Sequence, residues 1–71
     1  MTTYTFTVTG MHCASCGMLI DETLEDLPGV RSSTTSVRAG RTTVEVDDDT
    51  VTAADLAAAI TAVGYPNQPA P

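Results

Sequence analysis

The chain has no lysine and no tryptophan, and its three basic residues, all arginines, are outnumbered by nine aspartates and glutamates. The formal net charge of −6 argues against binding to nucleic acid, because that binding depends on neutralising phosphates with lysine and arginine. It equally disfavours an anionic membrane surface, and it favours a partner with a basic face.

Long apolar runs are also missing. No stretch approaches the ~20 residues that a membrane-spanning helix needs, so we expect no direct membrane insertion. Residues 1–9 have neither the basic segment nor the apolar core of a secretory signal peptide, and we therefore expect a cytoplasmic protein. With 71 residues the chain forms one domain with a thin core and has no room for a deep cleft between two lobes.

The first half of the chain predicts a strand followed by a helix. Aromatic and β-branched residues alternate with threonine over 4–9, which is typical of a half-buried strand. Apolar residues recur every three or four positions over 15–27, which predicts a helix with Ser15 as its N-cap. We expect the acidic residues of this helix mainly on its outer faces: Asp21, Glu22, Glu25 and Asp26.

The second half predicts a hairpin and a second helix. Residues 30–37 and 42–46 indicate two strands that turn at Ala39-Gly40. Thr52 begins a capping box, and the helix that follows is expected to end at Gly64. The chain after it is rich in proline, so it forms at best a short edge strand.

This order of elements predicts an α+β fold, a ferredoxin-like βαββαβ sandwich. Its four-stranded antiparallel sheet would carry two helices on one face. We expect a domain over residues 1–66 and a short proline-rich tail over 67–71.

The chemistry of the chain centres on residues 10–16, Gly-Met-His-Cys-Ala-Ser-Cys. In the cytoplasm two close cysteines more often bind a metal or act in catalysis than form a structural disulfide. We expect Cys13 in the loop and Cys16 in the first helical turn, where unpaired N–H groups and the helix dipole stabilise a thiolate.

The number of ligands favours copper. Two thiolates are a complete linear set for Cu(I), a soft ion that prefers sulfur, whereas a structural zinc site takes four ligands. The chain has no second cysteine pair, and its other strong donor beside Cys13 and Cys16 is His12. A partner's thiolate can enter an exposed two-thiolate site before an original ligand leaves, so such a site is suited to passing its metal on.

These residues resemble the GMxCxxC motif of the heavy-metal-associated domain family, and within it the small bacterial copper chaperones. The resemblance covers residues 4–66 and includes Leu27-Pro28-Gly29-Val30, Gly40, Val44-Glu45-Val46-Asp47, Leu56, Ala59-Ile60 and Gly64-Tyr65. It implies that Cys13 and Cys16 hold Cu(I) and that the protein delivers it to the metal-binding domain of a copper-transporting P-type ATPase. It also implies no enzymatic activity.

The resemblance further implies roles for two neighbours of the cysteines. Met11 would pack inward and steady the metal loop, a role that its residue type favours over thioether ligation. Tyr65 would lie close to the site, either supporting it or packing at the sheet edge. His12 is either a solvated neighbour or a third ligand, the latter in a copper-bridged homodimer.

The chain departs from the family in its second strand. Ser33 and Thr35 stand where relatives usually have valine, so we expect looser packing there and modest stability. Family members often carry lysines, and this chain has none.

Three other functions remain open. One is a thiol oxidoreductase, which the short length and the lack of tryptophan before the pair oppose. Another is an excised metal-binding domain of a copper-transporting P-type ATPase, although Met1, the short tail and Tyr65 favour a free-standing protein. The last is a carrier of mercury, zinc or cadmium; for mercury a signal peptide would be expected.

Overall fold

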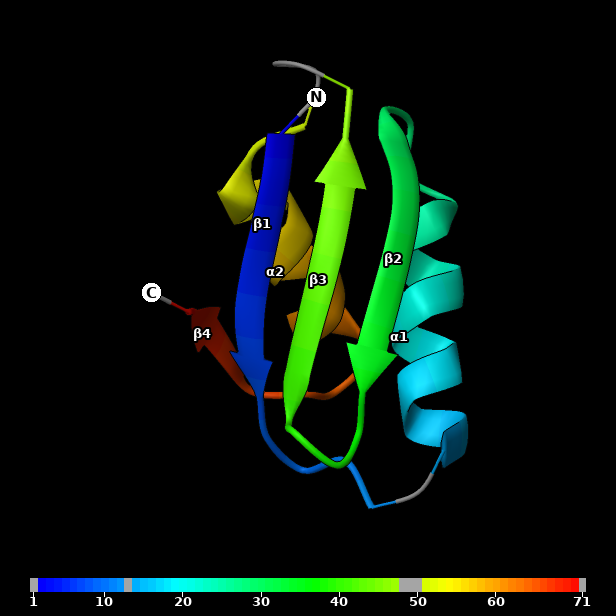
Figure 1. Cartoon of the computed structure of the whole chain (residues 1–71), viewed down its shortest axis with the longest axis vertical. Coiled ribbons are helices and arrows are strands. Elements are labelled where there is room, and N and C mark those ends of the chain that lie inside the picture. The colour runs from blue at the N-terminus through cyan, green and yellow to red at the C-terminus, as the bar shows by residue number, and fades with distance from the viewer. Residues whose placement is uncertain (1, 13, 48–50, 71) are drawn as a thin grey trace.

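The computed structural model describes residues 2–12, 14–47 and 51–70 as one sheet with two helices (Figure 1). The elements are β1 (Thr2–Val8), α1 (Ala14–Glu25), β2 (Val30–Ser36), β3 (Arg41–Val46), α2 (Ala53–Ala62) and β4 (Asn67–Pro69). The strands lie in the order β2-β3-β1-β4, every neighbouring pair is antiparallel, and both helices cover the same face. The predicted ferredoxin-like βαββαβ sandwich is therefore confirmed.

The hydrophobic core lies between the sheet and the two helices. Alternate residues of β1 and β3 point toward the helices because side chains alternate between the faces of a strand. The helices contribute apolar residues three and four positions apart, as an amphipathic helix does. The buried apolar side chains are Phe6, Val8, Ile20, Leu24, Val44, Val46, Val51, Leu56 and Ile60.

The other face of the sheet, which neither helix covers, carries many hydroxyl side chains. Thr5 of β1 and Thr34 of β2 lie on either side of Thr43 in β3, all opposite the core. Hydroxyl groups stay hydrated at such a surface, so the sheet is packed on one side only.

The first helix begins one residue earlier than predicted. Ala14 is already helical, so Ser15 lies inside α1 and the prediction that it caps the helix is wrong. Alanine has the highest helix propensity, and the apolar spacing cannot distinguish a start at 14 from a start at 15. The helix ends at Glu25, after which Leu27 N–H bonds to Leu24 carbonyl at 3.0 Å in a tighter turn.

The second helix has the predicted ends. Thr52 Oγ1 accepts a hydrogen bond from Asp55 N–H at 3.2 Å, and Asp55 Oδ2 accepts one from Thr52 N–H at 3.1 Å. This is the reciprocal pair of a capping box. Gly64 follows the helix with φ 98°, a left-handed conformation that favours glycine.

The last strand is short and lies at the sheet edge, as its prolines predict. β4 pairs with residues Phe6–Val8 of β1. Asn67 anchors it through its side-chain amide, which donates to Thr61 Oγ1 at 3.0 Å and to Ala57 carbonyl at 3.3 Å. Within the described ranges, both helices fall short of the length and apolar character that a membrane-spanning helix needs.

One acidic residue of α1 faces the sheet. Asp21 is half-buried, and its Oδ1 accepts hydrogen bonds from Ser33 Oγ at 2.7 Å and from Thr35 Oγ1 at 2.6 Å. The expectation of an outer-face position is therefore wrong for Asp21, although Glu22, Glu25 and Asp26 are exposed. The hydroxyls of β2 make hydrogen bonds where valines would make apolar contacts.

Candidate metal site

Three segments meet at one end of the sheet, the lower end in Figure 1: the loop between β1 and α1, the turn between β2 and β3, and the chain leading into β4. Val8 N–H bonds to Gly40 carbonyl at 2.8 Å, which joins the end of β1 to the turn. Thr9 N–H bonds to Pro66 carbonyl at 2.9 Å, which joins the loop to the chain before β4. The loop that carries the cysteine motif is therefore held from both sides.

Gly10 begins this loop in a left-handed conformation, with φ 86°. A side chain there would be strained, and a Cβ would lie 3.8 Å from Tyr65 Cδ1. The tyrosine ring thus packs beside the loop backbone. Tyr65 is half-buried and also contacts the hydrophobic core.

Cys16 lies in the first turn of α1 and is half-buried, so the predicted helical position is confirmed. The first N–H groups of a helix have no partners within it, and with the helix dipole they favour a thiolate over a thiol. Cys13 lies outside the described residues, so its approach to Cys16 remains a prediction. Among the described residues, which leave out Cys13, no three histidine, cysteine, aspartate or glutamate side chains converge as a metal cluster.

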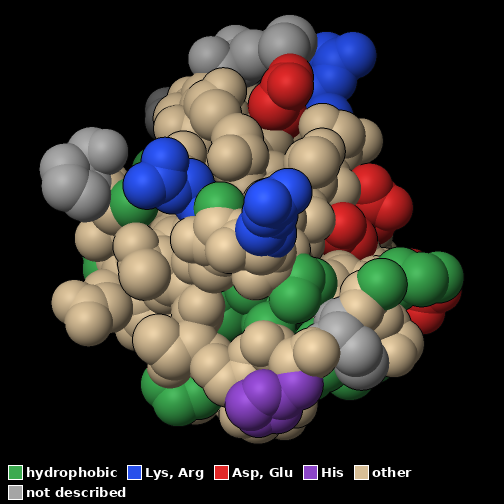
Figure 2. Space-filling view, turned by 60° about the horizontal axis from the view of Figure 1, so that its bottom comes forward, with side chains coloured by type: hydrophobic (Ala, Val, Ile, Leu, Met, Phe, Trp, Pro, Cys, Tyr) green, Lys and Arg blue, Asp and Glu red, His purple; other side chains and the backbone are tan. Residues whose placement is uncertain are grey.

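The two residues before Cys13 differ in burial. Met11 is half-buried and packs against the hydrophobic core, which holds the loop to the body of the domain. His12 is exposed, and Figure 2 shows the histidine surface at this end of the molecule. Its role as a ligand stays a prediction.

A groove of about 520 Å³ lies between the start of α1 and the end of β2. It is lined by Ala14, Gly17, Met18, Asp21, Thr35, Val37 and Arg38. Gly17 lets the helix approach the sheet closely, because a Cβ there would lie 3.1 Å from Val37 Cγ2 and 3.2 Å from Thr35 Cγ2. Met18 on the groove rim is 61% exposed, which is unusual for a large apolar side chain.

Sequence reasoning missed the groove residues. Gly17, Met18 and Arg38 belong to no motif, and Arg38 is 22 positions from Cys16 in the chain. The helical spacing of Gly17 is the sequence signal that could have identified it. Gly17 lies three positions before Ile20 and seven before Leu24, both of which are buried. A glycine on the buried side of a helix marks a close approach to a neighbouring element.

Comparisons with known proteins match nearly the whole chain. The model of the heavy-metal-associated domain matches residues 5–66. The copper chaperone CopZ of Staphylococcus saprophyticus is 38% identical over 65 residues, which cover 92% of this chain and 96% of that protein.

Solved structures agree with the sequence match. A CopZ metallochaperone superposes with a TM-score of 0.91 at 27% identity, covering 94% of this chain and 100% of that one. The N-terminal domain of a potential copper-translocating P-type ATPase from Bacillus subtilis, solved in its Cu(I)-loaded state, has a TM-score of 0.88 at 27% identity, with 94% and 84% covered. Other relatives contain a matching region that is only 6 to 12% of their length, among them a zinc-transporting ATPase and a mercuric reductase.

Proposed function

Because the chain belongs to the heavy-metal-associated domain family, we propose that it is a cytoplasmic Cu(I) carrier. It binds the ion through Cys13 and Cys16 and delivers it to a copper-transporting P-type ATPase. The observation that carries the proposal is the position of Cys16 in the first turn of α1, inside the motif of residues 10–16, at a surface end of the domain. The whole-length relationship to a copper chaperone supports the choice of metal.

The donor set accounts for the choice of Cu(I) on chemical grounds. Two thiolates satisfy a soft d¹⁰ ion in linear coordination, whereas zinc and cadmium take further ligands. His12 is the nearest additional nitrogen donor in the sequence and is exposed. We assign it no bond in the monomer and propose that it reaches copper only in a copper-bridged homodimer.

Delivery proceeds by ligand exchange without a redox step. A thiolate of the acceptor bonds to Cu(I) as a third ligand, and one Cu–S bond to the carrier then breaks. A second acceptor thiolate replaces the remaining carrier thiolate in the same way. The copper stays Cu(I) throughout, and the protons that the acceptor thiols lose balance those that the carrier thiols regain.

Metal titration tests this function. The reduced protein would be titrated anaerobically with Cu(I) against a chromophoric Cu(I) chelator, with Zn(II) as competitor. We expect the protein to bind one Cu(I) tightly, and Zn(II) should not displace it. The Cys13→Ser, Cys16→Ser variant should lose this Cu(I) binding. Failure to compete with the chelator, or a preference for zinc, would overturn the copper assignment. His12→Ala is the control at a neighbouring position, and it should leave the affinity of the monomer for Cu(I) unchanged.

A second role also has support from the comparisons. Several relatives carry this domain as a small part of a longer transporting ATPase, so the alternative to a carrier is the receiving domain of such a pump. Whether the gene encodes a free-standing protein distinguishes the two roles. The thiol oxidoreductase alternative loses support, because the fold is ferredoxin-like and matches metal-binding domains.

A further inference from the structure

A second groove lies at the end of the domain opposite the cysteine motif, between the end of α1 and the body of α2. α1 starts at the motif and has 12 residues, so its last residue lies about 18 Å from its first. Figure 1 shows the end of α1 and the start of α2 at the same, upper end of the domain. We call this cavity of about 510 Å³ the far groove, and its lining residues are Leu27, Pro28, Val51, Asp55, Ala58 and Ala59.

Most of the lining of the far groove is apolar, and part of it lies at the surface. Val51 is 5% exposed and belongs to the hydrophobic core, and Leu27 and Ala59 pack against that core. Pro28 and Ala58 are exposed, so a partner can reach the groove from solvent. Alanine has a short side chain, and α2 therefore leaves room here for a larger side chain from outside. The volume falls within the usual range for binding pockets.

Carboxylates surround the far groove. Asp55 lines it and is exposed. Asp26 is exposed and directly precedes Leu27 in the chain. The N–H of Asp47 bonds to the Gly29 carbonyl at 2.8 Å, which places Asp47 beside the turn that follows α1. A partner that enters the groove therefore meets negative charge at its rim.

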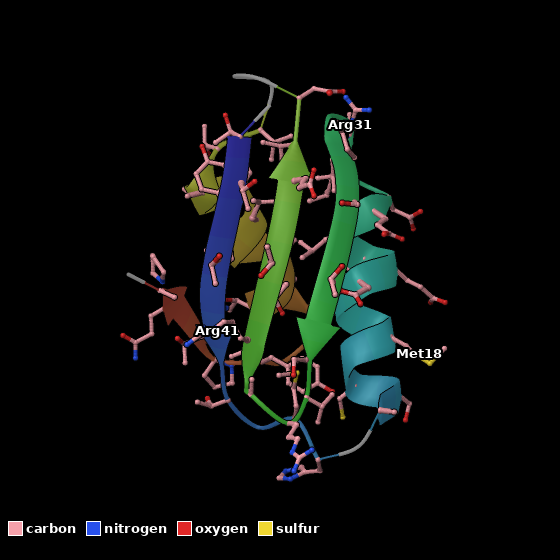
Figure 3. All side chains as sticks on the ribbon, in the orientation of Figure 1. Met18, Arg31 and Arg41 are labelled. Carbon is pink, nitrogen blue, oxygen red and sulfur yellow. The ribbon has the colours of Figure 1, made fainter. Side chains whose placement is uncertain are left out.

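Among the described residues, one arginine lies at this end of the domain. Arg31 is 3.4 Å from Asp47, and both side chains are more than half exposed, at 54% and 58%, so water weakens this ion pair. Figure 3 shows Arg31 at the upper end and Arg41 toward the lower end, and Arg38 lies in the turn before Arg41. One arginine against three carboxylates leaves the surroundings of the far groove negative.

These features together select one kind of occupant. A second copy of the chain would bring the same carboxylates against these, and like charges at an interface are unfavourable. An anionic membrane surface is repelled for the same reason. A large apolar side chain in a groove, with complementary charges around it, is a common basis of binding between proteins. The net charge of the chain favours a partner with a basic face, and the far groove gives that partner a location.

We propose that the far groove is a docking site for a basic segment of another protein. The segment inserts one large apolar side chain between the helices and places arginine or lysine beside Asp26, Asp47 and Asp55. Because the groove is separate from the cysteine motif, a partner bound there leaves the motif exposed. The domain can then be held by one protein while its metal end stays open to another. This inference does not depend on which metal the cysteines bind.

Two synthetic peptides without cysteine provide the probe. Each has a central tryptophan, which arginines flank in one peptide and glutamates in the other. The protein has no tryptophan, so the anisotropy of tryptophan emission reports on the peptide alone. Reduced, metal-free protein would be titrated into each peptide at low and at high salt. We expect the arginine peptide to bind about tenfold more tightly at low salt, with a smaller difference at high salt. Equal affinities, or tighter binding of the glutamate peptide, would overturn the proposal.

Amide chemical shifts measured by NMR locate the binding. The arginine peptide should shift the amide signals of Val51, Asp55 and Ala58 and leave those of Met11 and His12 unchanged. Shifts that are largest outside the far groove would overturn the proposal. Shifts of the groove amides when the protein alone is concentrated would assign the groove to a second copy. Equally tight binding of a blocked single tryptophan would assign it to small apolar ligands, and either of these two results would also overturn the proposal.

A lysine in the groove should compete with the partner. Ala58→Lys places a cation one helical turn after Asp55, where the two side chains are neighbours, and lysine is a good helix former. This variant should bind the arginine peptide about tenfold more weakly. Ala54→Lys is the matched control, because it makes the same change of net charge at an exposed position of α2 that does not line the groove. It should weaken binding by less than about threefold, and equal effects of the two variants would contradict the proposed site.

A neutral substitution tests the carboxylate of the groove. Asp55→Asn removes the charge and keeps an oxygen that can accept the N–H of Thr52, as Asp55 Oδ2 does at 3.1 Å. It should weaken binding of the arginine peptide by about threefold. Glu45→Gln is the control and should leave the affinity unchanged, because Glu45 lies between the buried Val44 and Val46 and so faces the side of the sheet that neither helix covers. The same loss in both variants would overturn the proposal.

The outcome is independent of the carrier function, since neither the protein nor the peptides contain metal in these measurements. Absence of peptide binding together with tight Cu(I) binding would overturn the docking site and leave the carrier function standing. Binding of the arginine peptide in the far groove supports the docking site even if the chelator titration shows no tight Cu(I) site.

Discussion

The hydroxyl of Thr35 in β2 donates a hydrogen bond to the carboxylate of Asp21 in α1 at 2.6 Å. The backbone N–H of Thr35 donates to the other oxygen of the same carboxylate at 3.2 Å. Since the one proton of the Thr35 hydroxyl goes to Asp21, Thr42 of β3 donates to Thr35 across the 2.9 Å contact between their hydroxyls. A chain of polar contacts thus runs from the first helix into the centre of the sheet, and two of its members, Asp21 and Thr35, line the groove between α1 and β2.

Removing the carboxylate should destabilise the domain. In Asp21→Ala, Thr35 and Ser33 lose a shared acceptor at a place that solvent only partly reaches. We expect the free energy of unfolding to fall by about 1–3 kcal/mol, the usual cost of an unsatisfied buried polar group. Urea unfolding of the apo protein measures it. Glu22→Ala, an exposed neighbour on the same helix, should change stability by less than about 0.5 kcal/mol. Equal effects would show that the Asp21 contacts contribute nothing specific.

A larger residue at Gly17 should separate α1 from β2. A Cβ at this position already lies 3.1 Å from Val37 Cγ2, and valine adds two methyl groups. We expect Gly17→Val to cost about 1–3 kcal/mol from overpacking, although valine has a better helix propensity than glycine. Ala54→Val, at an exposed position of α2, measures the propensity cost of valine alone. Unchanged or increased stability of Gly17→Val in urea would mean that the groove is wider than the structure shows.

Loss of the capping box should weaken the second helix. Thr52→Ala removes the side-chain acceptor of Asp55 N–H and should cost about 1 kcal/mol of unfolding free energy. Thr23→Ala is the control, because Thr23 Oγ1 donates to Leu19 carbonyl within α1, an interaction that adds little to a helix. Thermal unfolding by circular dichroism would compare the two variants, and a smaller loss for Thr52→Ala than for Thr23→Ala would contradict the prediction.

Cu(I) should raise the melting temperature of the reduced protein. A ligand that binds only the folded state stabilises it by about 2.7 kcal/mol when its concentration is 100 times Kd. The effect should be smaller at low pH, because bound thiolates hold no protons and the protons of the apo thiols compete with the metal as pH falls. Differential scanning calorimetry at two pH values tests this, with the Cys13→Ser, Cys16→Ser variant as control. A shift of the same size in that variant would place the copper elsewhere.

The elements and the core could be predicted from sequence because their signals are local. The alternation over 4–9, the spacing of Ile20 and Leu24, and the Thr52 capping box each specify their structure within a few residues. The heavy-metal motif likewise lies within residues 10–16, and the fold places Cys16 where that motif predicts.

Two features could not be predicted because they depend on neighbours distant in sequence. Asp21 was placed on the outer face by its residue type, although it lies one helical turn after Gly17, on the side of α1 that meets the sheet. Its partners are small hydroxyl residues of β2, a strand that has few apolar residues and for which we expected looser packing. Arg38 was missed in the same way, since only folding brings it to the groove that Ala14 and Gly17 also line.

The contacts between α1 and β2 also affect how copies of this domain meet one another. β2 is an edge strand, and unpaired N–H groups on such a strand invite a further strand to add. Here Asp21 and Glu25 accept the N–H groups of Thr35 and Ser33, at 3.2 Å and 3.1 Å. The opposite edge, β4, is three residues long and ends at Pro69, which has no N–H to offer. Both borders of the sheet thus resist edge-to-edge aggregation, and two copies brought close together are directed away from strand pairing.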